Sequence, residues 1–108
     1  MDHSTVEAFM LSMPNAKLDY PFGEDVAVYK VKDKMFALIA EGTEPLRISL
    51  KCDPRLSTIL KEKYESVMPG YHLNKKHWIT IVLSGQLPWE EIEGLIRHSY
   101  QLVLNKTQ

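Results

Sequence analysis

The sequence predicts a single α+β domain in which helices cover one face of an antiparallel sheet. The spacing of apolar residues changes from a helical period to a period of two near Val26, and returns to a helical period after Pro54. The chain has 108 residues, 44% hydrophobic and 25% charged, which suits one domain (residues 1–108) with an ordinary core.

Helices are expected at both ends of the chain. Ser4 or Thr5 can cap the first, whose apolar residues recur at helical spacing until Pro14. Residues 16–25 are expected to form a polar loop. Pro88 opens the last helix. Its expected buried stripe consists of Ile92, Leu95, Ile96, Ser99, Tyr100 and Val103.

Three strands with short connections are expected between residues 26 and 52, which indicates an antiparallel meander. Residues 35–42 are almost continuously apolar, as in a central strand buried on both faces. Residues 45–52 alternate between apolar and polar. The residues expected to face the core are Leu46, Ile48, Leu50 and Cys52.

A second helix is expected over residues 54–65, because Asp53 can cap it and Pro54 fits its first position. Residues 78–83 alternate again and predict a strand. Periodicity alone leaves open whether residues 66–72 form a strand that pairs with it.

The totals restrict the possible functions. A net charge of −1 argues against an obligate nucleic-acid binder, which usually has a strongly basic domain. The lone Cys52 excludes an internal disulfide and fits a reducing compartment. The N-terminus lacks a secretory pattern, and no apolar stretch approaches the about 20 residues of a membrane helix. We therefore expect a cytoplasmic protein that does not contact membranes.

Positive charge gathers in the middle of the sequence. Residues 1–29 hold one lysine against five acidic residues, whereas residues 30–76 hold ten basic residues against six acidic ones. If the helices cover one face of the sheet, the basic residues expected on the other face are Lys30, Lys32, Arg47 and Lys51. Such a face can meet phosphates or an acidic protein, or it can simply be the solvated side of the sheet.

The stretch PGYHLNKKHWITI, residues 69–81, concentrates polar and aromatic groups. His72 and His77 resemble metal ligands, but no acidic residue lies between Glu65 and Glu90 to join them, and we expect no metal or cofactor. No nucleophile stands beside a base, and Cys52 lies where a small thiol usually packs. We therefore expect no enzymatic activity.

If residues 66–72 pair with the following strand, Asn74, Lys75 and Lys76 lie at the tip of a hairpin and form a wing able to reach nucleic acid. The alternative is a turn whose lysines keep the sheet soluble. We expect Leu73 and Trp78 to anchor this hairpin to the core.

The two histidines of this stretch are expected to have structural roles. We expect a hydrogen bond between backbone and at least one of the His72 and His77 side chains.

The HLNKKHW run from His72 to Trp78, the GQLP turn from Gly85 to Pro88 and the Ser99–Tyr100 pair resemble the MmcQ/YjbR family of small bacterial proteins. The resemblance extends over nearly the whole chain. It implies an α-β(3)-α-β(2)-α fold similar to type III secretion chaperones and to frataxin-like (CyaY-like) domains. The family, largely uncharacterised, is commonly described as DNA-binding through a "double wing", and it supplies no catalytic residue.

Two functions are consistent with these observations. The first is a DNA-binding regulatory or accessory factor that contacts double-stranded DNA. Its expected contacts are Asn74, Lys75, Lys76, Lys30, Lys32, Arg47 and Lys51. The second is a protein-interaction or chaperone-like module that uses the uncovered face of the sheet. One continuous positive face favours DNA, whereas an exposed apolar patch favours a protein partner.

Overall fold

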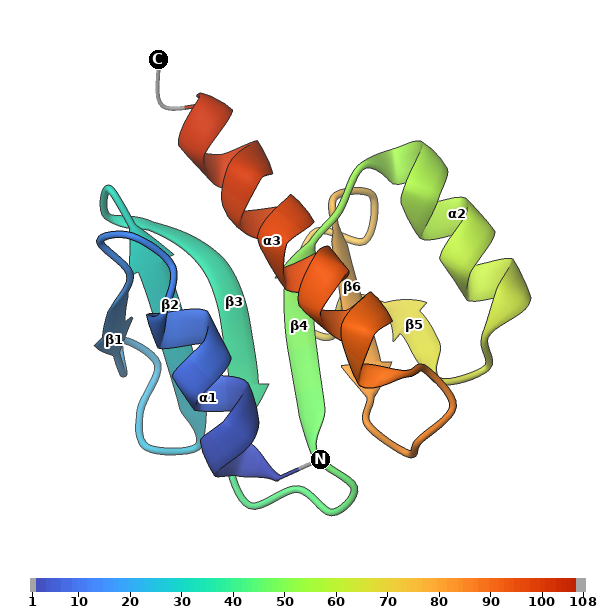
Figure 1. Ribbon diagram of the computed structural model, residues 1–108, viewed down its shortest axis with the longest axis horizontal. Coiled ribbons are helices and arrows are strands. Elements are labelled where there is room, and N and C mark those ends of the chain that lie inside the picture. Colours follow the sequence, from blue (N-terminus) through green and yellow to red (C-terminus); the bar gives the residue numbers. More distant parts are fainter. Residues whose placement is uncertain (1, 107–108) are drawn as a thin grey trace.

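The computed structural model describes residues 2–106 and has the predicted α+β architecture, built on a six-stranded antiparallel sheet (Figure 1). The strand order in the sheet is β1-β2-β3-β4-β6-β5. In chain order the elements are α1 (His3–Leu11), β1 (Lys17–Asp19), β2 (Val26–Val31), β3 (Lys34–Ala40), β4 (Arg47–Lys51), α2 (Pro54–Lys63), β5 (Val67–Pro69), β6 (Trp78–Val82) and α3 (Trp89–Lys106).

The sheet has one strand more than the family resemblance implied. β1 pairs with β2, although it lies in the stretch expected to be a loop and all three of its residues are exposed. An edge strand of this kind has no alternating pattern that a sequence can reveal. β5 answers the question about residues 66–72, since it pairs with β6 but ends at Pro69.

Several boundaries differ from the prediction by a few residues. Asp2, not Ser4 or Thr5, caps α1, because its Oδ1 accepts a hydrogen bond of 2.9 Å from the Thr5 backbone N–H. The turn between β2 and β3 contains Lys32 and Asp33, with φ angles of 52° and 63°. Lys32 therefore belongs to a turn and not to the face of a strand.

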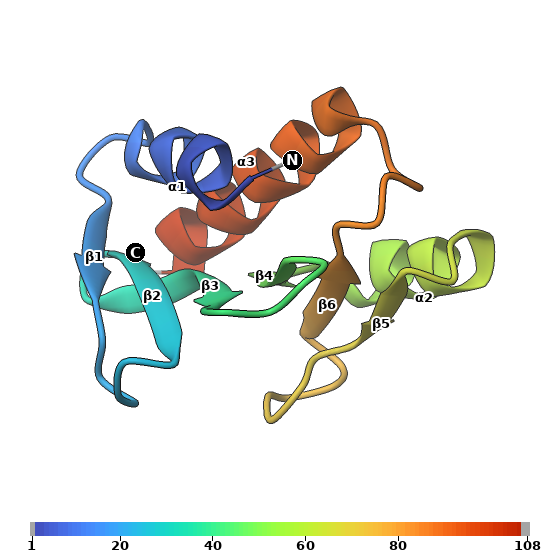
Figure 2. The ribbon, with the colours of Figure 1, turned by 90° about the horizontal axis from the view of Figure 1, so that it is seen from below.

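The main core lies between the sheet and the helices. Figure 2 shows α1 and α3 on the same side of the sheet. The predicted stripe of α3 is buried at every position, and the four predicted inward residues around β4 are buried as well. Ser99 joins α3 to two strands, because its hydroxyl donates to the Phe36 carbonyl and accepts from the Lys51 backbone N–H.

The other face of the sheet carries a small apolar cluster of its own. Val28, Leu38 and Trp78 are buried there, with Leu73 among the residues packed against them. The prediction that β3 is central and buried on both faces is confirmed. Figure 2 shows two loops hanging below this face, from its two ends. We call residues 20–25 wing 1 and residues 70–77 wing 2.

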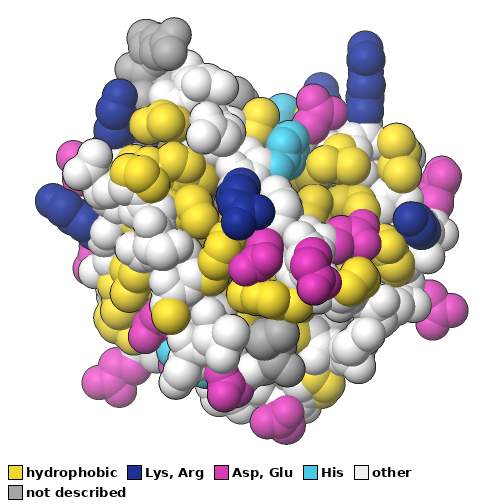
Figure 3. Space-filling model, in the orientation of Figure 1, with side chains coloured by type: hydrophobic (Ala, Val, Ile, Leu, Met, Phe, Trp, Pro, Cys, Tyr) yellow, Lys and Arg dark blue, Asp and Glu magenta, His cyan; other side chains and the backbone are white. Residues whose placement is uncertain are grey.

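The face that the helices cover shows no single type of surface. Figure 3 views this face, where apolar groups lie among charges of both signs and neither sign forms a continuous field. No helix in the described part of the chain is long and apolar enough to span a bilayer.

Candidate interaction site

Asn74 shapes wing 2 from within. Its side-chain Oδ1 accepts hydrogen bonds from the backbone N–H groups of Lys76 (2.9 Å) and His77 (3.3 Å), and its carbonyl accepts from Trp78 N–H (3.0 Å). The side-chain oxygen thus replaces a backbone partner at the tip, as an Asx turn does. The Asn74 side-chain oxygen is therefore already hydrogen-bonded within the wing. A contact between the Asn74 side chain and a DNA base would have to use this oxygen or the amide nitrogen.

The base of wing 2 depends on a close approach of two backbones. Gly70 N–H donates to the Trp78 carbonyl at 3.0 Å, and a Cβ on Gly70 would lie 2.7 Å from the Trp78 Cβ. Leu73 and Trp78 join the small apolar cluster, as the sequence predicted. Wing 2 is thus fixed both at its tip and at its base.

The expected role of the histidines is wrong. Among the described residues, neither imidazole makes a hydrogen bond. His72 is exposed in the left-handed region with φ at 58°, and its ring lies 4.0 Å from the Tyr71 ring between centroids. His77 contributes only its backbone, whose carbonyl accepts from Cys52 N–H at 2.8 Å.

The basic residues predicted to form one contact surface are dispersed. Lys30 is held by Asp19, with 3.2 Å between Nζ and Oδ2. Lys32 lies in the β2–β3 turn, and Lys51 is half-buried opposite Trp78 in the register of β4 and β6.

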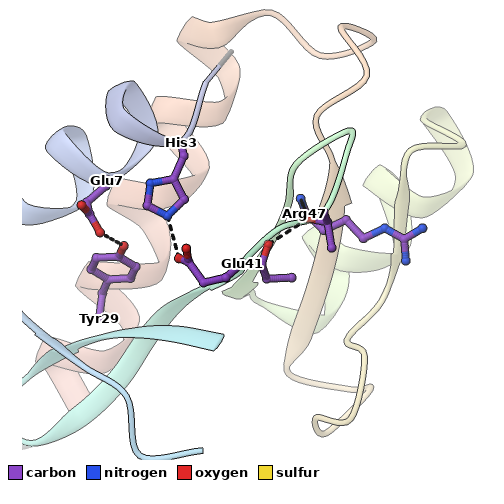
Figure 4. Close-up of polar contacts among 7 residues, drawn as sticks. His3, Glu7, Tyr29, Glu41 and Arg47 are labelled. Carbon is purple, nitrogen blue, oxygen red and sulfur yellow. Dashed lines mark hydrogen bonds and ion pairs between the residues drawn. The ribbon is translucent and has the colours of Figure 1, made fainter. Parts of the chain in front are cut away.

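Arg47, Lys75 and Lys76 are the exposed members of the predicted set near wing 2. Arg47 and Lys75 line the same hollow. Figure 4 shows the Arg47 side chain extending away from the contact that its backbone N–H makes with Thr43. Within residues 2–106, the side chains of these three cations have no ion-pair partner.

The two wings and the uncovered face of the sheet enclose a groove of about 610 Å³. Phe22 from wing 1 lines one side, and Tyr71 from wing 2 lines the other. The floor between them is formed by Val26, Leu38, Ala40, Ser49, Met68 and Thr80. A groove of this size lined mainly by apolar groups is typical of a binding site.

The polar atoms of the floor satisfy one another. The hydroxyls of Ser49 and Thr80 lie 2.8 Å apart, and Thr80 Oγ1 also accepts from the Tyr71 backbone N–H at 3.0 Å. The floor therefore behaves as an apolar surface despite its two hydroxyl groups.

Wing 1 is the part of this site that the sequence prediction missed. Phe22 is 63% exposed and Tyr71 is 68% exposed, the two highest values among the large apolar side chains of the described residues. The available signal was an aromatic residue between Pro21 and Gly23 in an otherwise polar loop. A single exposed aromatic is common on protein surfaces, but Phe22 is contiguous with the apolar floor of the groove, and a patch of that kind indicates a surface contact.

A cluster of titratable groups lies on the opposite side of the sheet, beneath α1 (Figure 4). Tyr29 donates to Glu7 Oε2, and His3 Nε2 lies 2.6 Å from Glu41 Oε1. Burial and then the bond to Glu7 raise the pKa of Tyr29. These contacts fasten α1 to the sheet.

The single thiol, that of Cys52, is buried. Burial raises the pKa of Cys52 to about 11, so the thiol stays protonated and weakly nucleophilic near neutral pH. Within residues 2–106, no three His, Cys, Asp or Glu side chains are grouped so that they could hold a metal ion.

Comparison with known proteins identifies the family. The YjbR family model matches residues 11–102. The chain belongs to the YjbR family. Its relatives include Escherichia coli O157:H7 YbdF, 36% identical over 95% of this chain and 84% of that protein. E. coli K12 YjbR is 33% identical over 97% of this chain and 89% of that protein. Both relatives are named as uncharacterized proteins.

Solved structures of similar proteins have the same fold. Deinococcus radiodurans DR2400, described with a DUF419 domain, superposes with a TM-score of 0.93 and 38% identity, covering 97% of this chain and 80% of its own. A Pseudomonas syringae protein superposes with a TM-score of 0.81 and 33% identity, covering 95% of this chain and 99% of its own. The arrangement of the sheet and helices is therefore shared with these two proteins.

Proposed function

We propose that this YjbR-family protein is a cytoplasmic protein-interaction module, without catalytic activity or cofactor, that receives a partner in the groove between its two wings. The observation that carries the proposal is an apolar groove bordered by two exposed aromatic side chains, Phe22 and Tyr71. Burying each fully would contribute about 1.5–3 kcal/mol. An exposed rim charge usually contributes under about 1 kcal/mol, so the apolar term dominates this site.

Site-specific photocrosslinking in living cells tests the proposal. A photoreactive phenylalanine analogue is placed at Phe22 or at Tyr71, inside the groove. The matched control is Ile59 on α2, which is 58% exposed but does not line the groove. We expect a discrete crosslinked protein from the two groove positions and none of it from Ile59.

A groove-filling variant separates binding from folding. Ala40→Phe places a ring on the floor and should remove the crosslinks while the protein still unfolds cooperatively on heating. The same crosslinked species from all three positions, or no crosslinks from the groove, would count against the proposal.

Duplex DNA is the second candidate, and one observation favours it: Lys75 and Lys76 are exposed together on wing 2, with Arg47 nearby in the groove. Wing 1 opposes it, because Glu24 and Asp25 are exposed where a duplex spanning both wings would bring its phosphates. DNA contact would therefore be confined to the wing 2 side.

Salt-dependent titration of labelled duplex DNA tests this candidate. Three cations that each neutralise one phosphate predict a slope of log K against log salt of about −2.7. Lys75→Glu/Lys76→Glu should remove most of this slope, and Arg55→Glu/Lys63→Glu on α2 should not. Absence of binding at low salt, or binding unchanged in the first variant, rejects DNA as the partner.

A further inference from the structure

The two wings that border the groove carry opposite charge. Wing 1 holds Glu24 and Asp25, both exposed, and its segment contains no basic residue. Wing 2 holds Lys75 and Lys76, also exposed, and contains no acidic residue. Among the described residues, the side chains of these four have no ion-pair partner. Wing 1 is therefore acidic and wing 2 is basic, and the groove between them has a mainly apolar floor with Arg47 as a further exposed cation in its lining.

The floor favours an occupant whose backbone N–H and C=O groups already make hydrogen bonds within the occupant itself. It runs across the strands, and its hydroxyls are paired with each other, so it offers few groups to the backbone of an extended peptide. A folded loop can instead insert a side chain and keep its own hydrogen bonds. Wing 1 is such a loop, with Gly23 N–H donating to the Tyr20 carbonyl at 3.2 Å and Phe22 exposed at its tip.

We propose that the groove receives wing 1 of a second copy of this chain, so that two copies form a two-fold symmetric dimer through their uncovered sheet faces. This names the partner of the site under the proposed function and rests on it. A two-fold axis through the centre of the groove brings wing 1 of each copy against wing 2 of the other. Both contacts then pair Glu24 and Asp25 with Lys75 and Lys76, while Phe22 enters the apolar groove.

The geometry also fits the symmetry requirement of such an interface. A two-fold interface needs a surface that is complementary to itself, with each contact made twice. A groove that was acidic or basic at both ends would repel its own copy, whereas this one attracts it at both ends. The two exposed aromatics lie at opposite walls, so each copy contributes Phe22 next to the partner copy's Tyr71.

Charge swapping tests the dimer. The mass of the full chain is measured by sedimentation velocity over a range of concentrations. We expect the wild type to dimerise. Glu24→Lys/Asp25→Lys, which makes both wings basic, and Lys75→Glu/Lys76→Glu, which makes both acidic, should each raise the dimer Kd by at least about tenfold. An equimolar mixture of the two variants should dimerise again, because each contact then joins opposite charges.

Two controls separate loss of the dimer from a general effect of charge or of misfolding. Arg55→Glu/Lys63→Glu changes charge equally on α2 and should leave the dimer intact, and circular dichroism checks that all variants fold. A monomeric wild type, or a mixture that stays monomeric, overturns the dimer. If Phe22 crosslinks a different protein while the wild type is monomeric, only the dimer fails. If the groove positions crosslink nothing, the proposed function fails as well.

Discussion

Wing 1 and wing 2 border the same groove but are built in different ways. Wing 2 is fixed by the Asn74 side chain at its tip, by the contact of Gly70 with Trp78 at its base, and by Leu73 in the apolar cluster. Wing 1 has two long backbone hydrogen bonds of 3.2 and 3.5 Å around its tip and one of 2.8 Å from Glu41 N–H to the Asp25 carbonyl at its base, and Phe22 is left in solvent. Wing 2 thus uses Leu73 and Asn74 to hold its shape and leaves Tyr71 exposed, whereas wing 1 leaves Phe22 exposed without comparable side-chain contacts.

The difference explains why the most distinctive run of the sequence is not the most available surface. In HLNKKHW, Leu73, Asn74 and Trp78 hold the hairpin, and the exposed residues are His72, Asn74, Lys75 and Lys76. The loop around Phe22 uses fewer of its side chains to hold its conformation. A distinctive residue pattern can therefore reflect the conformational requirements of a turn, while an exposed aromatic lies in a loop with a simpler sequence.

The largest change in the free energy of unfolding is expected when the side chain that anchors wing 2 is removed. Trp78→Ala deletes a buried indole and should destabilise the protein by about 3–5 kcal/mol. Phe22→Ala, which removes an exposed aromatic from wing 1, should change the free energy of unfolding by under about 0.5 kcal/mol. Urea unfolding of both variants measures this contrast. Similar losses in the two variants would mean that the wings are equally integrated with the core.

The sequence predicted the fold well wherever burial imposes a period. The α3 stripe from Ile92 to Val103, the alternation around β4 and the apolar run of β3 follow directly from which side chains meet the core. β1 escaped because Lys17, Leu18 and Asp19 are all exposed, so its pairing leaves no apolar pattern.

The site was predicted only in part, because its parts come from opposite ends of the sheet. The wing 2 tip and the anchoring roles of Leu73 and Trp78 could be read locally. Arg47 and Lys75 come together only through sheet order, and the pairing of Lys30 with Asp19 depends on the β1–β2 register. The histidine prediction failed because a side-chain amide, that of Asn74, supplies the acceptor that shapes the turn.

The second prediction tests the base of wing 2. Gly70→Ala forces a Cβ to within 2.7 Å of the Trp78 Cβ, so strand or loop must move. We expect a loss of about 1–3 kcal/mol, as for other overpacked sites. Gly94→Ala on α3 is the control, because its Cβ would meet nothing within 4 Å, and it should stabilise by about 0.5–1 kcal/mol. A neutral Gly70→Ala would show that the base of wing 2 adapts as freely as wing 1.

The third prediction tests the tip. Asn74→Ala removes the acceptor of the Lys76 and His77 backbone N–H groups and should cost about 1 kcal/mol, as the loss of a helix cap does. Asn74→Asp keeps an acceptor oxygen and should lose much less. Lys75→Ala, one position away, should stay within about 0.5 kcal/mol of the wild type. If Lys75→Ala and Asn74→Ala destabilise equally in thermal unfolding, the tip is not held by the Asn74 side chain.

The smallest expected effect is a pH-dependent change that occurs at wing 1 and not at wing 2. A carboxylate holds the entry to wing 1, where Asp19 Oδ1 accepts from Tyr20 N–H at 2.8 Å; this bond, and then Lys30, lower the pKa of Asp19. Because folding lowers the pKa of Asp19, the ionised carboxylate stabilises the fold fully above the ordinary pKa of 3.8. This stabilisation is lost as the pH falls through the lower pKa of the folded protein. The tip of wing 2 uses a neutral amide instead. In an NMR titration from about pH 5 to pH 2, the Tyr20 amide should therefore shift while the Lys76 amide shifts little. Asp19→Asn should abolish the Tyr20 shift, and its persistence in that variant would place the titrating group elsewhere.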